Sequence, residues 1–301
     1  MSYASTGLIE ATDYNNLAAT ITTAMGVGSG AVGYGQDLSA INTVAAAGTV
    51  TATQWSGLLT TLNKALGHQS GAGAQLSVPT ITAGGTITYA ATVATAVTQI
   101  NTNAALYAAN GGTTTGSTFT TGVSSTTGVN TSTDRYVTFA SAQAARYFFN
   151  AGGSLRLVVG YNSGNGSAST LSLQRLIDQN NGIIIYNTSN SGCQGTGGTV
   201  NTNTTTIGYR NTNYAAETLI TRVYDATGAY TADYSEVNTY TNSNDTTNGA
   251  NGNQVNFRYR YVVTDHPWDD TISLNITTRV DIVYPESTYL TTNSWGTPSI
   301  T

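Results

Sequence analysis

A segment near the start of the chain occurs twice, and this repeat constrains the fold more than any other feature. Residues 7–26 read GLIEATDYNNLAATITTAMG, and residues 48–67 read GTVTATQWSGLLTTLNKALG. The copies coincide at their terminal glycines and at most apolar positions. Each copy also keeps an aromatic residue with a leucine three positions later: Tyr14 and Leu17 in the first, and Trp55 and Leu58 in the second.

Each copy predicts one amphipathic helix, because its apolar residues recur at helical spacing. We expect the first helix over Asp13–Met25, with the Thr12 hydroxyl as its N-cap and Gly26 in the left-handed position that ends it. The second helix should run over Gln54–Leu66 and end at Gly67. The shared positions are those of the cap, the apolar stripe and the end, so the chain repeats packing geometry.

A third helix is expected from Thr88 to Ala109, on a shallow stripe of apolar residues. We therefore predict that residues 1–110 form a helical docking or oligomerisation module built on the duplicated unit. The residues proposed to carry its packing and assembly are Tyr14, Leu17, Trp55 and Leu58.

The loop between the two copies, Gly26–Gln36, is rich in glycine and contains GSGAVG over Gly28–Gly33. This is the spacing of a dinucleotide-binding fingerprint, which should follow a buried strand and open a helix. Here the motif follows a helix instead. We interpret the segment as a structural loop of tight turns, and we predict no cofactor.

Charge is scarce in this chain. Charged residues make up 8% of the 301 residues, against about 25% in an ordinary soluble domain. The net charge is −5 and the basic residues are scattered, whereas a nucleic-acid surface needs them clustered. No apolar stretch approaches the roughly 20 residues of a membrane span, and no signal peptide is visible at the start. We expect neither a nucleic-acid partner nor a membrane partner.

The remainder of the chain predicts β structure. Residues 111–133 are a Thr/Ser/Gly tract that we interpret as a linker or extended arm, and residues 134–301 as a β-rich domain with short helices. The expected fold class is α+β, with the helical module followed by a mainly antiparallel, sandwich-like domain. The helices expected in the β-rich domain are Ala140–Asn150 and Leu171–Gln179, and its strands are Arg135–Phe139, Ser154–Tyr161, Ile183–Tyr186, Ala215–Tyr224, Val237–Thr241, Gln254–Val263 and Thr271–Tyr284.

Residues that could carry chemistry are few. His68 follows the expected end of the second helix, where a cation suits the helix dipole. His266 lies in the acidic loop Asp265–Asp270, which we interpret as a turn between strands; whether this loop binds an ion stays open. Cys193 is the sole cysteine, so neither an internal disulfide nor a cysteine-rich metal site is possible. We predict no metal site and no enzyme.

Acidic residues in the β region are expected to be solvated side chains, although paired carboxylates for sugar cleavage depend on a three-dimensional separation. Tyrosines there are candidate exposed aromatics for glycan binding. The acidic residues are Glu217, Asp225, Asp233 and Glu236, and the tyrosines are Tyr209, Tyr214, Tyr230, Tyr234 and Tyr240.

Several short motifs together resemble virion structural proteins of tailed bacteriophages, notably contractile-tailed phages of aquatic bacteria. They are ATDYNNL near the start, GYGQ at 33–36, ATQWSGLLTTLN in the second copy, VTFASAQAARYFFNAGGSLRL at 137–157 and SWGTP at 294–298. The resemblance implies a component of the tail, neck, baseplate or fibre, assembled into a virion in the host cytoplasm. Its implied partners are copies of itself and other virion proteins.

Low charge agrees with a self-packing chain, because buried ions cost desolvation energy, and tyrosine is favoured at interfaces. Three hypotheses therefore remain. The first is the virion structural protein of the tail, neck, baseplate or fibre, to which a capsid decoration protein is an alternative. The second is a fibre or adhesin that binds a host surface glycan, and the third is a depolymerase with convergent carboxylates.

Overall fold

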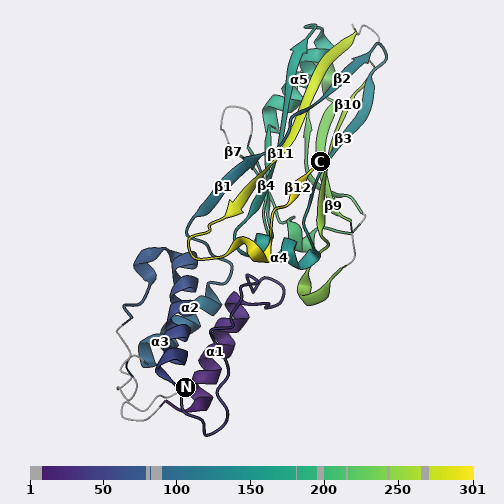
Figure 1. Cartoon of the computed structure of the whole chain (residues 1–301). Coiled ribbons are helices and arrows are strands. Elements are labelled where there is room, and N and C mark those ends of the chain that lie inside the picture. Colours follow the sequence, from purple (N-terminus) through teal and green to yellow (C-terminus); the bar gives the residue numbers. More distant parts are fainter. Residues whose placement is uncertain are drawn as a thin grey trace.

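The computed structural model describes residues 9–78, 82, 90–180, 182–194, 200–214, 216–242, 245–265 and 271–301. Helices gather at the N-terminal end of the chain, and two antiparallel sheets follow (Figure 1). The α+β class with a sandwich-like β part is confirmed. The molecule is elongated, with a helical module at one end and the sandwich extending away from it.

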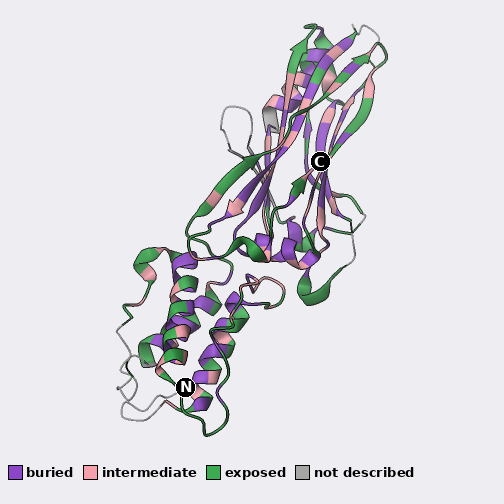
Figure 2. Cartoon of the chain, viewed as in Figure 1, coloured by how far each residue is buried: buried purple, intermediate pink, exposed green. Residues whose placement is uncertain are grey.

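The helical module, residues 9–109, packs α1 (Ala11–Met25), α2 (Ala52–Ser70) and α3 (Ala90–Thr102) together. Each helix turns its apolar stripe inward, so the purple buried residues in Figure 2 face the neighbouring helices. Burial of such stripes supplies most of the stability of short helices, whose intrinsic propensity is marginal.

The helix ends differ from the expectation. α1 begins at Ala11 with Glu10 as N-cap and no side-chain cap, so Thr12 lies inside the helix. Gly26 does end α1, but with φ −85° rather than in the left-handed region. α2 continues past Gly67 to Ser70, and Gly71 at φ 85° ends it. Glycine is required at position 67 for packing, because a Cβ there would lie 2.5 Å from the Tyr289 ring.

α2 carries a capping box that sequence analysis missed. The Thr51 hydroxyl accepts the backbone N–H of Gln54, and the Gln54 side chain accepts the N–H of Thr51 at 2.9 Å. Two first-turn donors that have no helical partner are thereby satisfied.

Replacing Thr51 by alanine should lower the free energy of unfolding by about 0.5–2 kcal/mol, because the Gln54 N–H in the first turn of α2 loses its acceptor. Thr12→Ala is the matched control, since Thr12 is also an exposed threonine in the first turn of a helix but caps nothing. It should change stability by less than about 0.5 kcal/mol. Urea unfolding of both variants checks this, and equal losses would contradict the assignment of the cap.

α3 ends at Thr102, seven residues before the expected Ala109, and residues 88 and 89 lie outside the described part. The segment that follows turns back toward α2, where the Ala108 N–H donates to the His68 carbonyl at 2.8 Å. Ala104 is buried as the stripe predicted, whereas Tyr107 is exposed.

The described strands form a seven-stranded sheet in the order β1-β11-β4-β5-β6-β7, with β2 also on β11, and a five-stranded sheet in the order β12-β3-β10-β9-β8. The first sheet comprises β1 (Asn110–Thr115), β2 (Phe119–Ser125), β4 (Ser154–Gly164), β5 (Ile183–Tyr186), β6 (Ser191–Gln194), β7 (Val200–Thr205) and β11 (Ile272–Pro285). The second comprises β3 (Val129–Thr138), β8 (Thr218–Tyr224), β9 (Tyr234–Thr241), β10 (Gln254–Val263) and β12 (Ser299–Ile300).

The sandwich core follows the period-two patterns of the sequence. In β10 every second residue is apolar or aromatic and is buried: Val255, Phe257, Tyr259 and Tyr261. The same holds in β4 for Leu155, Leu157 and Val159. Predicted bounds for β5 and β10 agree with the structure.

The tract 111–133 is not a linker. It forms most of β1, all of β2 and the first half of β3. β1 and β2 pair with successive parts of β11, and β3 pairs with β10 over its whole length. Threonine is β-branched and favours strands, a preference that the polar composition of the tract concealed. The β part of the chain therefore begins at β1.

Two helices close opposite ends of the sandwich (Figure 1). α5 (Ala168–Asn180) contacts strands of both sheets at the end far from the helical module. α4 (Ala142–Asn150) lies at the near end, where Phe148 and Phe149 pack against Phe139, just after β3, and against Tyr284 and Tyr186 of the seven-stranded sheet. The outward face of α4 meets the helical module.

Candidate functional site

The four predicted packing residues lie inside the helical module. Their exposed fractions are 0–1%, and the Tyr14 hydroxyl also donates to the Gln54 carbonyl at 3.4 Å. The residues are Tyr14, Leu17, Trp55 and Leu58. They hold α1, α2 and α3 together, and none of them presents a face to another molecule.

The candidate site is the junction between the helical module and the sandwich, which the sequence did not predict. Its first part is the glycine loop, Gly26–Gln36, whose backbone carbonyls converge on α4. The guanidinium of the fully buried Arg146 donates to the carbonyls of Val32 at 2.8 Å and Gly30 at 3.3 Å, and also to that of Val27. The Asn150 amide donates to the carbonyls of Gly30 and of Gly33.

The loop needs its glycines for these turns. Gly28 and Gly33 have φ 51° and 102°, and a Cβ on Gly28 would lie 2.2 Å from the Val32 carbonyl oxygen. Gly35, at φ 68°, packs directly against the Tyr147 ring. A phosphate site would need convergent N–H donors, whereas here carbonyl acceptors converge on a cation. The structural interpretation of the loop therefore has direct geometric support.

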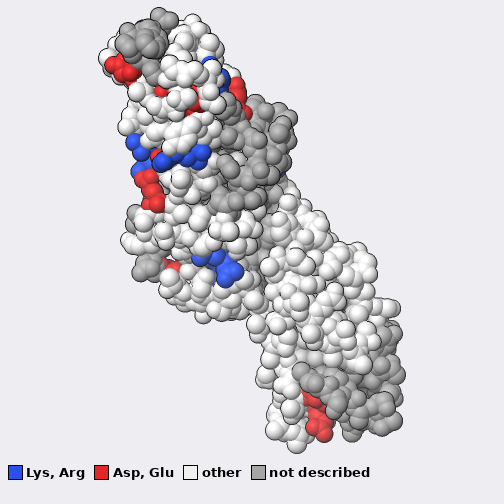
Figure 3. Space-filling model, turned by 180° about the vertical axis from the view of Figure 1, so that it is seen from behind, with Lys and Arg blue, Asp and Glu red and all other residues white. Residues whose placement is uncertain are grey.

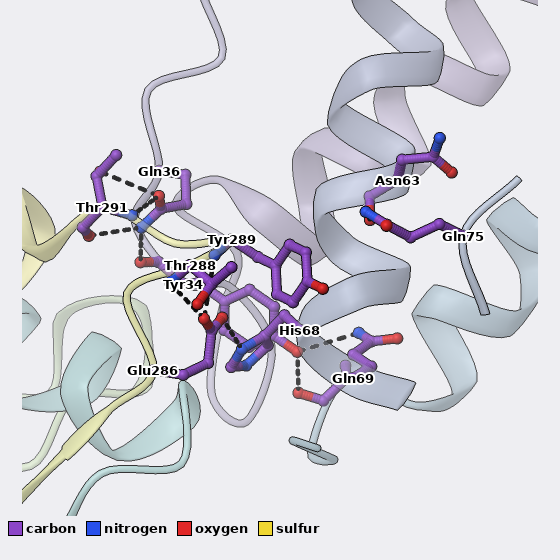
Figure 4. Close-up of polar contacts among 11 residues, drawn as sticks. Tyr34, Gln36, Asn63, His68, Gln69, Gln75, Glu286, Thr288, Tyr289 and Thr291 are labelled. Carbon is purple, nitrogen blue, oxygen red and sulfur yellow. Dashed lines mark hydrogen bonds and ion pairs between the residues drawn. The ribbon is translucent and has the colours of Figure 1, made fainter. Parts of the chain in front are cut away.

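The second part of the junction is a buried His68–Glu286 pair (Figure 4). The imidazole Nδ1 lies 2.9 Å from Glu286 Oε1, and His68 is fully buried. A carboxylate only accepts, so Nδ1 carries the hydrogen. His68 does lie in the last turn of α2, close to where it was expected, but the helix continues to Ser70, and the ring points to the sandwich and binds Glu286.

Glu286 is held from several sides. Its Oε2 accepts the backbone N–H groups of Thr288 at 2.6 Å and Tyr289 at 3.0 Å. Burial by itself raises the pKa of the Glu286 carboxyl, but the hydrogen bonds from His68 and from these two N–H groups outweigh it, so the pKa is lowered. The ionised form is thus the one that the junction stabilises.

A lowered folded-state pKa means that the contribution of Glu286 is complete above the pKa of the unfolded chain, near 4.5. It is lost as the pH falls from there through the folded-state pKa. Glu286→Gln should cost about 1.5–3 kcal/mol at pH 7 and should flatten the decline of stability between pH 5 and pH 3. Urea unfolding across this range measures it.

Gln36→Ala serves as the control for that experiment, because it removes junction hydrogen bonds without removing a titrating group. It should lower stability at every pH and keep the wild-type slope. An acid slope that is the same in Glu286→Gln and wild type would show that Glu286 does not titrate with unfolding.

Gln36 adds polar contacts across the junction, and Tyr34 adds others beside it within the helical module (Figure 4). The Gln36 side chain donates to the Thr291 carbonyl at 3.2 Å and accepts the Thr291 N–H at 2.8 Å. The buried Tyr34 hydroxyl donates to the Ala104 carbonyl at 2.9 Å and accepts from Gln69 at 3.0 Å. Burial raises the pKa of Tyr34 to about 12, so the hydroxyl stays protonated and donates. Sequence reasoning missed these partners because they are remote along the chain.

Three of the four acidic residues that were expected to be solvated are not. Asp225, Asp233 and Glu236 are buried, whereas Glu217 is exposed as expected. Asp225 accepts from Arg175 at 3.0 Å, and Asp233 accepts the Ser172 hydroxyl at 2.8 Å. Each buried carboxylate thus has internal hydrogen-bond donors that offset its desolvation.

The candidate tyrosines separate into two groups. Tyr209 is buried, and its hydroxyl donates to the Gly252 carbonyl at 2.8 Å, so it is not an exposed aromatic. Tyr214 is half exposed, while Tyr230, Tyr234 and Tyr240 are partly buried.

The outward face of the five-stranded sheet gathers charged and aromatic side chains. Arg222 binds Glu236 at 2.7 Å, and Arg258 binds Asp134 at 2.8 Å. The Tyr234 ring lies 5.0 Å from the Arg222 guanidinium. Acidic and basic side chains also stand close together on the face of the sandwich seen in Figure 3. This face offers rings, cations and carboxylates together.

Within the described ranges, no group of three or more His, Cys, Asp or Glu side chains could hold a metal ion. No described helix is long and apolar enough to span a membrane. Cys193 is buried, and burial raises the pKa of its thiol. Residues 266–270 of the Asp265–Asp270 loop lie outside the described part.

No protein-family model, curated protein or solved structure matches the chain. The functional conclusion therefore rests on the residues and geometry of the chain, together with the resemblance of its motifs.

Proposed function

We propose that the chain is a structural component of a bacteriophage virion, in the tail, neck, baseplate or fibre region, that acts by self-assembly and docking. The observation that carries the proposal is the division of charge. Only four of the 25 charged residues lie in residues 1–110, and 21 lie in the remaining 191. The face of the helical module seen in Figure 3 is almost free of charge apart from an acidic spot near its far end.

Such a module is suited to close packing in an assembly. Burying an ion at an interface costs desolvation energy that a hydroxyl or amide side chain does not incur to the same degree. The exposed side chains along α1 and α3 are mainly small and polar, for example Asn16, Thr23, Thr95 and Thr98. The module therefore has a surface that other virion proteins can cover at low electrostatic cost.

The junction adds a mechanical reason. Arg146 makes three hydrogen bonds across it, Glu286 makes one to His68, and both side chains are buried. A module joined in this way keeps its orientation to the sandwich. A rigid, elongated subunit can dock at one end while its other end points away from the particle. In the proposal, the helical module docks and the sandwich points outward.

A glycan-binding fibre or adhesin is the second candidate. The outward face of the five-stranded sheet favours it, because sugar rings stack on aromatic rings while their hydroxyls bind charged and amide groups. A depolymerase has less support, since Asp225, Asp233 and Glu236 are buried and bound by donors of the same chain.

The decisive test is location. An affinity tag on this chain in the phage genome, detected by gold labelling and by mass spectrometry of purified particles, should place it at one region of the tail, neck, baseplate or fibre in a fixed copy number. Its absence from purified particles would contradict the proposal. Glycan-array binding by the full chain, lost in Tyr234→Ala but kept in Tyr107→Ala, would favour the adhesin instead.

A further inference from the structure

The outer edge of β2 is an unprotected sheet edge. β2 pairs with β11 at seven successive positions without a register shift, from Phe119↔Thr278 to Ser125↔Ile272. Within the described residues no strand pairs with its other side. The outward N–H and C=O groups of such a strand form a template for another strand.

β2 lacks the features that usually keep an edge strand from pairing with another strand. Natural edge strands are protected by charged side chains, proline, bulges or short length. Residues 110–125 read NGGTTTGSTFTTGVSS, which has no charged residue and no proline. β1 is bulged between Asn110 and Thr113, but β2 is regular. Only small side chains are exposed along the middle of β2: Thr120, Gly122 and Ser124.

The other described edges of the sandwich are protected. β8 carries a register shift between Leu219 and Thr221, and an exposed Arg222 follows. β12 has only two residues, and beyond it β3 carries Asp134 and Arg135. β7 joins β6 with a register shift and contacts β8. The same chain therefore protects its other edges while leaving β2 open, which indicates that β2 is covered when the protein functions.

We propose that β2 is a subunit interface, at which it pairs antiparallel with β2 of a second copy of this chain. This inference deepens the proposed virion function and rests on its self-assembly. About a two-fold axis at Gly122, Thr120 of one copy lies opposite Ser124 of the other, and the two seven-stranded sheets become one continuous sheet.

The lack of charge argues for a second copy as the occupant. A two-fold contact places a strand against itself, so any charge on β2 would lie near the same charge of the partner strand. An edge without charge and with small side chains is complementary to itself. The strand is also held firmly, since the Arg135 guanidinium lies 4.0 Å from the centre of the Phe119 ring and ties β2 to β3.

The test uses the full chain with Thr120→Lys and Ser124→Lys together. Both positions are exposed, so the added side chains reach solvent without disturbing the pairing with β11. In a β2–β2 pair, lysines would then lie opposite lysines at both ends. Sedimentation equilibrium should show dimers or even-numbered oligomers for the wild type, and at least about a tenfold higher dissociation constant for the double variant.

Matched controls separate charge from misfolding. Leu219→Lys on the protected β8 edge should associate like the wild type. Mixing the double-lysine chain with a Thr120→Glu, Ser124→Glu chain should restore dimers, because opposite charges then face each other. Amide hydrogen exchange should be slower along β2 in the wild-type oligomer than in the double-lysine variant.

A wild-type chain that stays monomeric at all concentrations would overturn the inference, as would a double-lysine variant with the wild-type association. The virion proposal fails independently, if the chain is absent from purified particles. The two failures are therefore distinguishable.

Discussion

Replacing Arg146 by alanine should uncouple the helical module from the sandwich. The guanidinium donates to three carbonyls of the glycine loop and to the Gln143 side chain, and it is fully buried. Alanine leaves the Val27 and Val32 carbonyls without this donor, whereas the Gly30 carbonyl keeps the Asn150 amide, and each hydrogen bond lost from the charged guanidinium costs about 1.5–3 kcal/mol. We expect a loss of about 3 kcal/mol or more of junction stability, with the two parts unfolding separately.

Arg156→Ala is the control, because Arg156 is a half-buried arginine of β4 outside the junction. It should change stability by less than about 0.5 kcal/mol. Urea unfolding followed by circular dichroism should show one transition for the wild type and two for Arg146→Ala. Limited proteolysis should then release the sandwich. A single unshifted transition for Arg146→Ala would show that the junction does not hold the two parts together.

Replacing Trp55 by alanine should unfold the helical module or leave it marginally stable. Trp55 is 1% exposed and lies in the core shared by α1, α2 and α3. Truncation of a buried tryptophan leaves a cavity and costs about 3–5 kcal/mol. A module of about 100 residues has a total stability of a similar order. If the module docks the chain, this variant should also be missing from virions.

Ser56→Ala is the adjacent control, on the exposed side of the same helix, and it should change stability by less than about 0.5 kcal/mol. Hydrogen exchange should show the Trp55→Ala loss confined to the module, with the sandwich amides still protected. Normal incorporation of Trp55→Ala into particles would contradict docking through the module.

Local patterns in the sequence sufficed for much of the fold. The duplicated stripe correctly predicted that α1 and α2 exist, and alternation in β10 correctly predicted which of its faces is buried. These predictions succeed because burial of one face depends on spacing within a single element. Helix ends were less predictable: Thr12 was expected to cap the first helix but lies inside it, and the cap that Thr51 forms on the second was missed, because capping depends on backbone geometry.

The junction could not be predicted in the same way. His68 and Glu286 are separated by 218 positions, and neither residue has a neighbour in sequence that indicates the other. The burial of Asp225 and Asp233 was also missed, because a carboxylate looks solvated until the fold supplies its donors.

By itself, the sequence determined the helical unit and its duplication, the sandwich strands with strong alternation, and the scarcity of charge, because these are properties of short segments and of composition. The tertiary structure alone decided that the threonine tract forms strands, that the carbonyls of the glycine loop bind Arg146, and that no described strand covers the outer edge of β2. Each of these depends on which distant segments share hydrogen bonds, and no local pattern encodes that choice.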